Sequence, residues 1–187
     1  MTRIPLIPSD DPDAVRYGVF SSFAAEQREP IDLYRALANV PELLLAYRSL
    51  PQHLRHAAVS PRRLRELAVL RVAQLVGSAY EWSHHRPMAM KAGVSEAQID
   101  ALASWRSSDR FDADERPVLA AVDAIHDLRL SDAEFTALEE RLGRHGAVEI
   151  VVAVAQYEAT ARIIQALGVD VEPSYAPYLT GFEPFTE

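Results

Sequence analysis

The most informative part of the sequence is ELAVLRVAQLVGSAYEWSHH, residues 66–85. Its first half is apolar on nearly every side of a helix, and a helix that is apolar all round is buried. Glu66 and Arg71 interrupt this pattern, and buried charges are tolerated only when they are paired or hydrogen-bonded. We therefore expect a buried helix from about Ser60 to Val76, which ends at Gly77 and carries two charged groups to the interior.

A second helix follows at once, because Ser78-x-x-Glu81 has the form of a capping box. At about 100° per residue, Trp82 and His85 share a face with Ser78 and Glu81, whereas His84 points elsewhere. Glu81 and His85 are four residues apart, so their side chains lie one turn apart and can interact. A carboxylate raises the pKa of a neighbouring imidazole and burial lowers it. The pair is predicted to titrate near neutral pH, where general acids and bases work best.

The rest of the chain also favours helices. It has only seven glycines among its 187 residues, and no alternating pattern between hairpin turns indicates a strand. We predict a single all-α domain of about eight or nine helices over residues 1–187. An N-terminal arm covers about residues 1–13 and a proline-broken, aromatic tail covers about residues 169–187, packed on its own domain or on a neighbouring subunit. Other expected helices span residues 14–26, 31–38, 41–48 and 147–167.

Composition excludes several classes of function. The net charge of −8 argues against a nucleic-acid partner, which requires a concentrated basic surface. The absence of cysteine excludes disulfides, thiolate metal sites and a thiol nucleophile. No signal-like stretch and no run of about 20 apolar residues occurs, so we expect a cytoplasmic protein with no membrane partner.

Simpler interpretations of the second helix remain open. Ser78 and Glu81 would be only a helix cap if they behave like Ser95-x-x-Gln98, Asp112-x-x-Glu115 and Ser131-x-x-Glu134, which have the same form. His85 would then be a core histidine, and Trp82 core filling. A metal site at Glu81, His84 and His85 is disfavoured because the two histidines diverge on a regular helix. Ser78 as a hydrolase nucleophile lacks the strand-turn-helix elbow that such a serine needs.

The spacing of Glu66, Ser78, Glu81 and His85 resembles the motif of the carboxymuconolactone decarboxylase and alkylhydroperoxidase D-like superfamily. There, a glutamate precedes a Cys-x-x-Cys pair, and a histidine follows it. Both cysteines are replaced here, as in a cysteine-free branch, and this excludes thiol peroxidase activity. The resemblance implies an alkylhydroperoxidase D-like helical bundle that assembles as a homotrimer or homohexamer.

The resemblance also implies a reaction, namely cofactor-free lyase or isomerase chemistry by proton transfer on a small lactone or related carboxylate. We assign Glu66, Glu81 and His85 as catalytic residues, and expect no cofactor and no metal. The predicted substrate contacts are Ser78, Tyr80, Arg71 and Trp82. The alternative is a non-catalytic binding or scaffold protein that retains the fold. An open void beside His85 and Glu81 would favour the enzyme, and a sealed imidazole would favour the scaffold.

Overall fold

A computed structural model describes residues 2–184 of the chain. They form nine α-helices and two short 3-10 helices with no strand among them, which confirms the all-α prediction. The α-helices are α1 Pro12–Arg16, α2 Ser21–Ala25, α3 Asp32–Leu37, α4 Pro41–His56, α5 Arg62–Leu75, α6 Ala79–Lys91, α7 Glu96–Ala101, α8 Glu115–His126 and α9 Asp132–Leu167. The 3-10 helices are η1 Leu102–Ser104 and η2 Ala176–Leu179.

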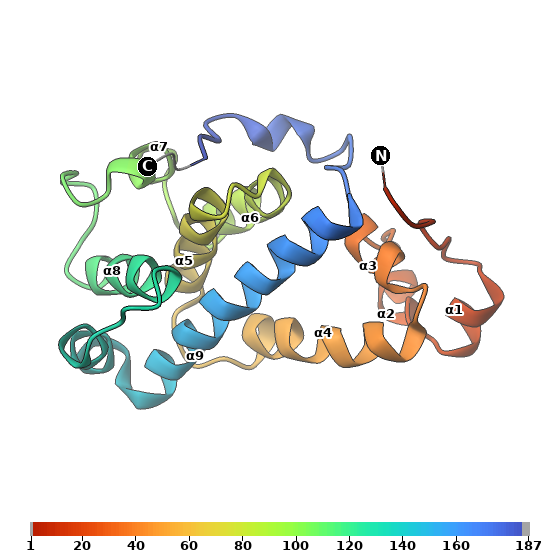
Figure 1. Cartoon of the computed structure of the whole chain (residues 1–187), viewed down its shortest axis with the longest axis horizontal. Coiled ribbons are helices and arrows are strands. Elements are labelled where there is room, and N and C mark those ends of the chain that lie inside the picture. Colours follow the sequence, from red (N-terminus) through yellow and green to blue (C-terminus); the bar gives the residue numbers. More distant parts are fainter. Residues whose placement is uncertain (1, 185–187) are drawn as a thin grey trace.

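Helix α5 lies at the centre of the molecule, as its apolar pattern predicts. It packs against α6, α8 and α9, and α9 runs diagonally between α6 and α4 (Figure 1). Leu67 and Leu70 face α6, whereas Ala68 and Val72 face α8 and α9, so the two apolar faces of α5 belong to two separate core clusters. Burial on both sides explains why this helix is not amphipathic.

The turn between α5 and α6 is as tight as the sequence predicts. Gly77 adopts φ +66°, a left-handed conformation that glycine reaches without strain. Ser78 follows as the N-cap of α6, with its side chain accepting a hydrogen bond from the Glu81 N–H at 3.3 Å. This turn fixes the register of α6 against α5 and so determines which α6 side chains face Glu66.

Two predicted boundaries are wrong. Helix α4 continues through Pro51 to His56, because Pro51 and Leu54 still bury one face of the helix beyond Arg48, and this burial outweighs the hydrogen bond that proline cannot make. The helical run Asp132–Leu167 is interrupted at Gly143 (φ 68°, ψ 168°), so its second part begins at about residue 144, a few residues before the predicted start near 147. Gly146 lies inside α9, where an added Cβ would approach the Leu142 Cβ to 2.8 Å.

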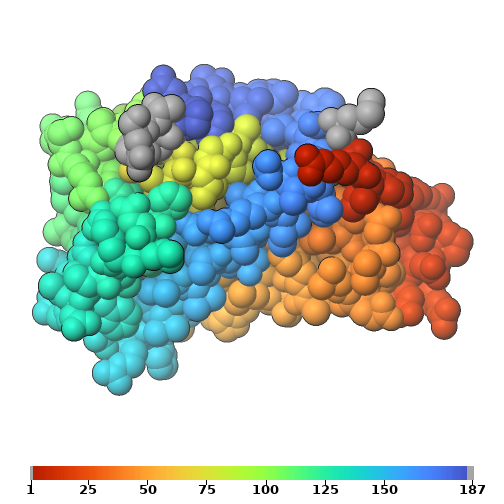
Figure 2. Space-filling model, viewed as in Figure 1, coloured from red at the N-terminus to blue at the C-terminus, as the bar shows by residue number. Residues whose placement is uncertain are grey.

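Both ends of the chain lie against the helical body. Arg3 donates its N–H to the Leu167 carbonyl at the end of α9, and the segment after α9 runs back over α6 through η2. Figure 2 shows this C-terminal segment covering α6 along one edge of the molecule. Residues 185–187 of the expected tail lie outside the described residues. Among residues 2–184, no helix is long and apolar enough to cross a membrane.

Candidate active site

A buried hydrogen bond joins α5 to α6 through Glu66 and His85. The His85 Nδ1 atom lies 2.8 Å from Glu66 Oε2, and both residues are buried. Burial raises the pKa of Glu66, but the His85 imidazole and its hydrogen bond, together with Arg62, outweigh burial and hold this pKa below its usual range. Glu66 is thus ionised and only accepts, so the His85 Nδ1–H donates. This bond fixes the tautomer, and the unprotonated Nε2 faces away from Glu66.

Glu81 occupies the other side of the imidazole. Its Oε2 atom lies 3.4 Å from His85 Nε2, one helical turn along α6. Burial raises the pKa of Glu81 to about 8, with Arg55 opposing this rise and Glu66 adding to it. Burial also lowers the pKa of His85, although Glu66 partly offsets this. At pH 7 the pair therefore consists of a protonated carboxyl beside a neutral imidazole.

The Ser78–Glu81 pair differs from the other caps of the same form. In the pairs Ser95–Gln98, Asp112–Glu115 and Ser131–Glu134, the second side chain accepts a hydrogen bond from the backbone N–H of the first residue. The Ser78 N–H instead donates to the Ala73 carbonyl at 2.8 Å. Glu81 is thereby released from capping, and its carboxyl turns toward His85. Ser78 therefore caps α6, but Glu81 is not the reciprocal partner of a capping box.

A cavity of about 50 Å³ opens beside these two side chains. Helix α6 contributes Glu81 and His85, and the edge of the Tyr157 ring packs against the imidazole at 4.7 Å between ring centroids. A void of this size holds several water molecules or a group of a few non-hydrogen atoms. Its remaining walls come from α3, α4 and α9 and from elsewhere on α6: Ile31, Leu33, Tyr34, Tyr47, Pro51, Arg55, Tyr80, His84, Met88 and Thr160. The imidazole is buried, but it is not sealed in hydrocarbon.

Tyr80 and His84 border the same cavity and are held by the C-terminal segment. Glu172 accepts hydrogen bonds from the Tyr80 hydroxyl at 2.9 Å and from His84 Nε2 at 2.7 Å. It also accepts from the Asp32 N–H at the start of α3, at 2.8 Å. The His84 ring is stacked between Tyr80 and Tyr175, with centroid separations of 4.2 and 3.6 Å. One carboxylate therefore ties the C-terminal segment to α3 and α6.

Two predicted substrate contacts lie away from this cavity. Trp82 is fully buried in the core cluster between α5, α7 and α8, where it packs near Phe182. Trp82 directly follows Glu81, and successive residues are about 100° apart around a helix, so Trp82 faces the core while Glu81 faces the cavity. Ser78 serves as the helix cap. The structure brings Glu66, Glu81, His85 and Tyr80 together and leaves Trp82 in the core.

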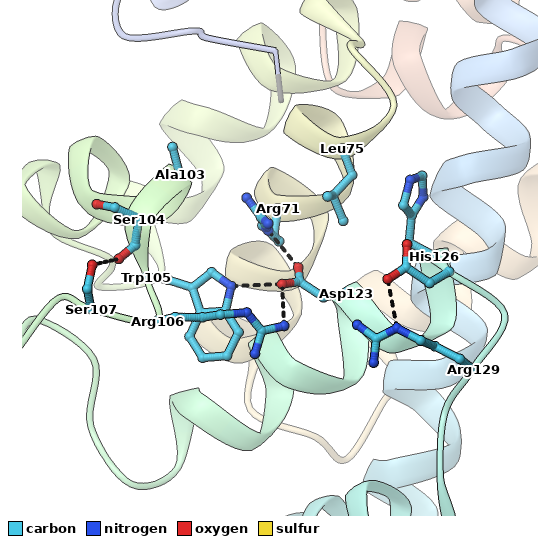
Figure 3. A pocket seen from close by; sticks show the side chains of 11 residues that line it. Arg71, Leu75, Ala103, Ser104, Trp105, Arg106, Ser107, Asp123, His126 and Arg129 are labelled. Carbon is cyan, nitrogen blue, oxygen red and sulfur yellow. Dashed lines mark hydrogen bonds and ion pairs between the residues drawn. The ribbon is translucent and has the colours of Figure 1, made fainter. Parts of the chain in front are cut away.

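Arg71 also lies elsewhere, in a cleft of about 620 Å³. Asp123 occupies its centre and accepts hydrogen bonds from Arg71 Nε at 2.7 Å, Trp105 Nε1 at 3.1 Å and Arg106 Nη2 at 2.9 Å (Figure 3). These bonds tie α5 to α8 and to the loop after η1. The Arg71 side chain points toward α8 and not toward α6. Because α5 is buried on all sides, its charged side chain needs a partner on a neighbouring helix, and Asp123 on α8 provides it.

Several groups at the site were not identified from the sequence. Arg55, Tyr47 and Tyr157 come from α4 and α9, and nothing in their local sequence indicates that they approach α6. Glu172 lies in the proline-broken tail, which is predicted from the sequence to pack on its own domain or on a neighbouring subunit, with no particular contact assigned. In the sequence, only the apolar and aromatic residues of these segments indicated that the segments are buried. In residues 2–184, no group of three or more His, Asp or Glu side chains is arranged to hold a metal ion.

Comparisons with known proteins bear on the family resemblance and on the fold. Residues 41–124 match the model of the carboxymuconolactone decarboxylase family. The uncharacterized protein YdfG of Bacillus subtilis is 25% identical over 131 residues, which are 68% of this chain and 88% of that protein.

Solved structures share the fold over almost the whole chain. A cysteine variant of the debrominase Bmp8, in complex with 2,3,4-tribromopyrrole, has a TM-score of 0.79 and 20% identity over 98% of this chain and 100% of that one. An uncharacterized peroxidase-related protein from Ralstonia eutropha, described as an alkylhydroperoxidase AhpD core, has a TM-score of 0.77 and 18% identity over 98% of both chains. Residues 41–124 of this cysteine-free chain are thus similar to the carboxymuconolactone decarboxylase family, and the chain has the alkylhydroperoxidase D-like fold.

Proposed function

We propose that this protein is a cofactor-independent lyase or isomerase that moves a proton to or from carbon in a small lactone or related carboxylate. The observation that carries the proposal is the row Glu66–His85–Glu81, in which His85 and Glu81 line a cavity and Glu66 lies behind the imidazole. Its two ends differ in protonation, since Glu66 is ionised and Glu81 carries a proton at pH 7. Two carboxyl groups whose environments separate their pKa values are typical of acid–base catalysis.

In this proposal Glu81 is the general acid and His85 carries the proton between Glu81 and the surroundings. The 3.4 Å between Glu81 Oε2 and His85 Nε2 is longer than a hydrogen bond in a working site, but such contacts often shorten when substrate binds. Glu66 holds the imidazole in the tautomer whose Nε2 accepts a proton. In this proposal, Glu66 is the residue that orients the imidazole and Glu81 is the acid.

Water supplies the one proton that decarboxylation consumes, so the reaction needs no other reactant. In decarboxylation, the bond from carbon to the carboxylate breaks, its electron pair stays on the carbon next to the lactone carbonyl, and the Glu81 proton is transferred to that carbon. The Glu81 carboxylate then regains a proton from solvent through His85. In isomerisation, the same pair removes a proton from one carbon and returns it to another. General acid–base assistance of this kind contributes about 10² to 10⁴-fold in rate.

Debromination is the activity named for Bmp8, and the structural complex of that protein contains a cysteine substitution. This chain has no cysteine. Chemistry that requires a thiol at this position therefore has no equivalent here, and we propose a reaction that needs only proton transfer.

Deuterium uptake from solvent tests the proposal. A panel of small lactone carboxylates is incubated with the protein in D₂O, and mass spectrometry follows carbon dioxide loss and deuterium bound to carbon. We expect at least one compound to acquire deuterium at carbon in a Glu81-dependent manner. Absence of both signals across the panel, or uptake unchanged in Glu81→Gln, would reject proton transfer at this site and leave the non-catalytic binding protein as the better interpretation.

A further inference from the structure

Arg55 lies near the end of α4, at the junction of three voids. It lines the cavity of about 50 Å³ beside Glu81 and His85, a smaller one of about 20 Å³ beside Glu66, and an outer one of about 140 Å³. The outer cavity shares Ile31, Tyr34, His84 and Met88 with the inner one. We call the outer cavity the vestibule. Arg55 thus borders both the vestibule and the void at the proposed acid.

The guanidinium of Arg55 has no hydrogen-bond or ion-pair partner among residues 2–184, although the residue is half-buried. The other arginines of the vestibule are engaged. Arg28 pairs with Glu26 at 2.6 Å, and Arg48 bonds to the Val19 carbonyl and to the Ser22 hydroxyl. A guanidinium that borders a cavity without a partner retains its full capacity to bind an anion.

The carboxylates nearest to the inner cavity do not neutralise Arg55. Glu66 is bonded to Arg62 at 3.2 Å and to His85 at 2.8 Å. Burial keeps Glu81 protonated near neutral pH. The protein as a whole carries a net charge of −8, yet the inner cavity is lined by an arginine that makes no direct ion pair in the described part of the chain. An entering anion meets attraction from Arg55 and no ionised carboxylate that lacks a partner.

We propose that Arg55 is the substrate-anchoring residue of this site, and that it binds the carboxylate of a small organic acid that enters through the vestibule. The inner cavity is also lined by the apolar side chains of Leu33, Pro51 and Met88, which suit the hydrocarbon part of such a molecule. Charge-assisted bidentate hydrogen bonds from arginine to a carboxylate give orientation as well as affinity. The inference rests on the proposed function and assigns its specificity to one side chain.

Anion binding is measured without turnover, so the two proposals are tested separately. Acetate and its neutral isostere acetamide are titrated into the full-length protein at pH 7 and followed by NMR at the backbone amides around the inner cavity. We expect saturable acetate binding and no binding of acetamide. Arg55→Gln should weaken acetate binding at least about tenfold, and Arg55→Lys should weaken it less, because the charge is kept but the bidentate geometry is lost.

Two further variants complete the test. Arg106→Gln removes an arginine from the separate cleft around Asp123 and should leave acetate affinity unchanged. Glu81→Gln should keep acetate affinity while losing turnover, which separates anchoring from acid catalysis. The inference is overturned if wild type binds no acetate, if acetamide binds equally well, if Arg55→Gln binds like wild type, or if the loss occurs in Arg106→Gln instead.

Discussion

The Oε2 atom of Glu81 lies 3.4 Å from Nε2 of His85, on the opposite side of the ring from the hydrogen bond to Glu66. A neutral imidazole between two carboxyl groups can donate a hydrogen bond to the one that is ionised and accept a hydrogen bond from the one that is protonated. The low pKa of Glu66 and the raised pKa of Glu81 meet this condition. The consequences for rate, pH dependence and stability follow from this difference.

Glu81→Gln should lower kcat by at least about 10²-fold on any substrate that wild type turns over, because the amide has no transferable proton. Glutamine is the neutral isostere of the protonated carboxyl present at pH 7, so the fold should tolerate it. Steady-state kinetics and thermal unfolding measure the two effects. Glu140→Gln, on the exposed face of α9, is the matched control and should change neither. Wild-type kcat in Glu81→Gln would contradict the assignment of the acid.

The stability difference between wild type and Glu81→Gln should depend on pH. The folded-state pKa of Glu81 is raised from 4.5 to about 8, so its stability contribution is fully present below the unfolded value and is lost as pH rises through about 8. Wild type should therefore lose stability relative to the variant between pH 5 and 8, by a few kcal/mol. The charged or titratable groups around it are Glu66, His85, Arg55, Tyr47, Tyr80, Tyr34 and Tyr157.

Denaturant unfolding at several pH values measures this difference. His85 acts in the opposite direction, since its folded-state pKa is lowered and its contribution is lost as pH falls. His85 is present in both proteins, so subtracting the two curves removes most of its effect. A difference that stays constant with pH would mean that Glu81 is ionised in the folded protein at neutral pH.

Glu66→Gln should reduce kcat more than it changes KM, because Glu66 positions the imidazole and does not border the cavity where substrate binds. Loss of the negative charge should also lower the pKa of His85 further, since Glu66 opposes the effect of burial on that group. NMR titration of the His85 ring detects this shift, which a merely structural role would not produce. Arg62→Gln, which removes only the exposed partner of Glu66, should have a smaller effect on both quantities.

Glu172→Ala should lower the free energy of unfolding by about 1–3 kcal/mol, because the Tyr80 hydroxyl and the Asp32 N–H lose an acceptor in a poorly solvated region. Denaturant titration gives this value, and Glu26→Ala is a control in which an exposed ion pair is lost. We further expect faster hydrogen exchange at the start of α3 in Glu172→Ala. Unchanged exchange there would show that this carboxylate does not hold the C-terminal segment to α3.

Asp123→Ala should destabilise the fold by about 3–5 kcal/mol, because two arginines and a buried tryptophan lose their common acceptor. Turnover per folded molecule should be unchanged, because this cleft is separate from the cavity beside His85. Activity is compared with wild type at a temperature where both are folded. A selective fall in kcat would support the predicted contact of Arg71 with substrate and would contradict its separation from the cavity beside His85.

The sequence by itself determined the all-α class, the buried α5, the tight turn at Gly77 and the common face of Glu81 and His85. These features depend on local periodicity, capping and the conformational freedom of glycine, which residues close together in the chain determine. The resemblance to the family motif also placed Glu66 in a register with His85. Spacing left open whether Ser78 and Glu81 formed only a cap, because both outcomes have the same local pattern.

Only the tertiary structure decided between these outcomes. The Ser78 N–H bonds to Ala73, Glu81 turns to the imidazole, and α4 and α9 bring Arg55 and Tyr157 to the same cavity. The tertiary structure also pairs Arg71 with Asp123 on α8 and places Trp82 in the core. These choices depend on contacts between segments far apart in the chain, because a helix that is apolar all round does not specify which neighbour will meet each of its polar side chains.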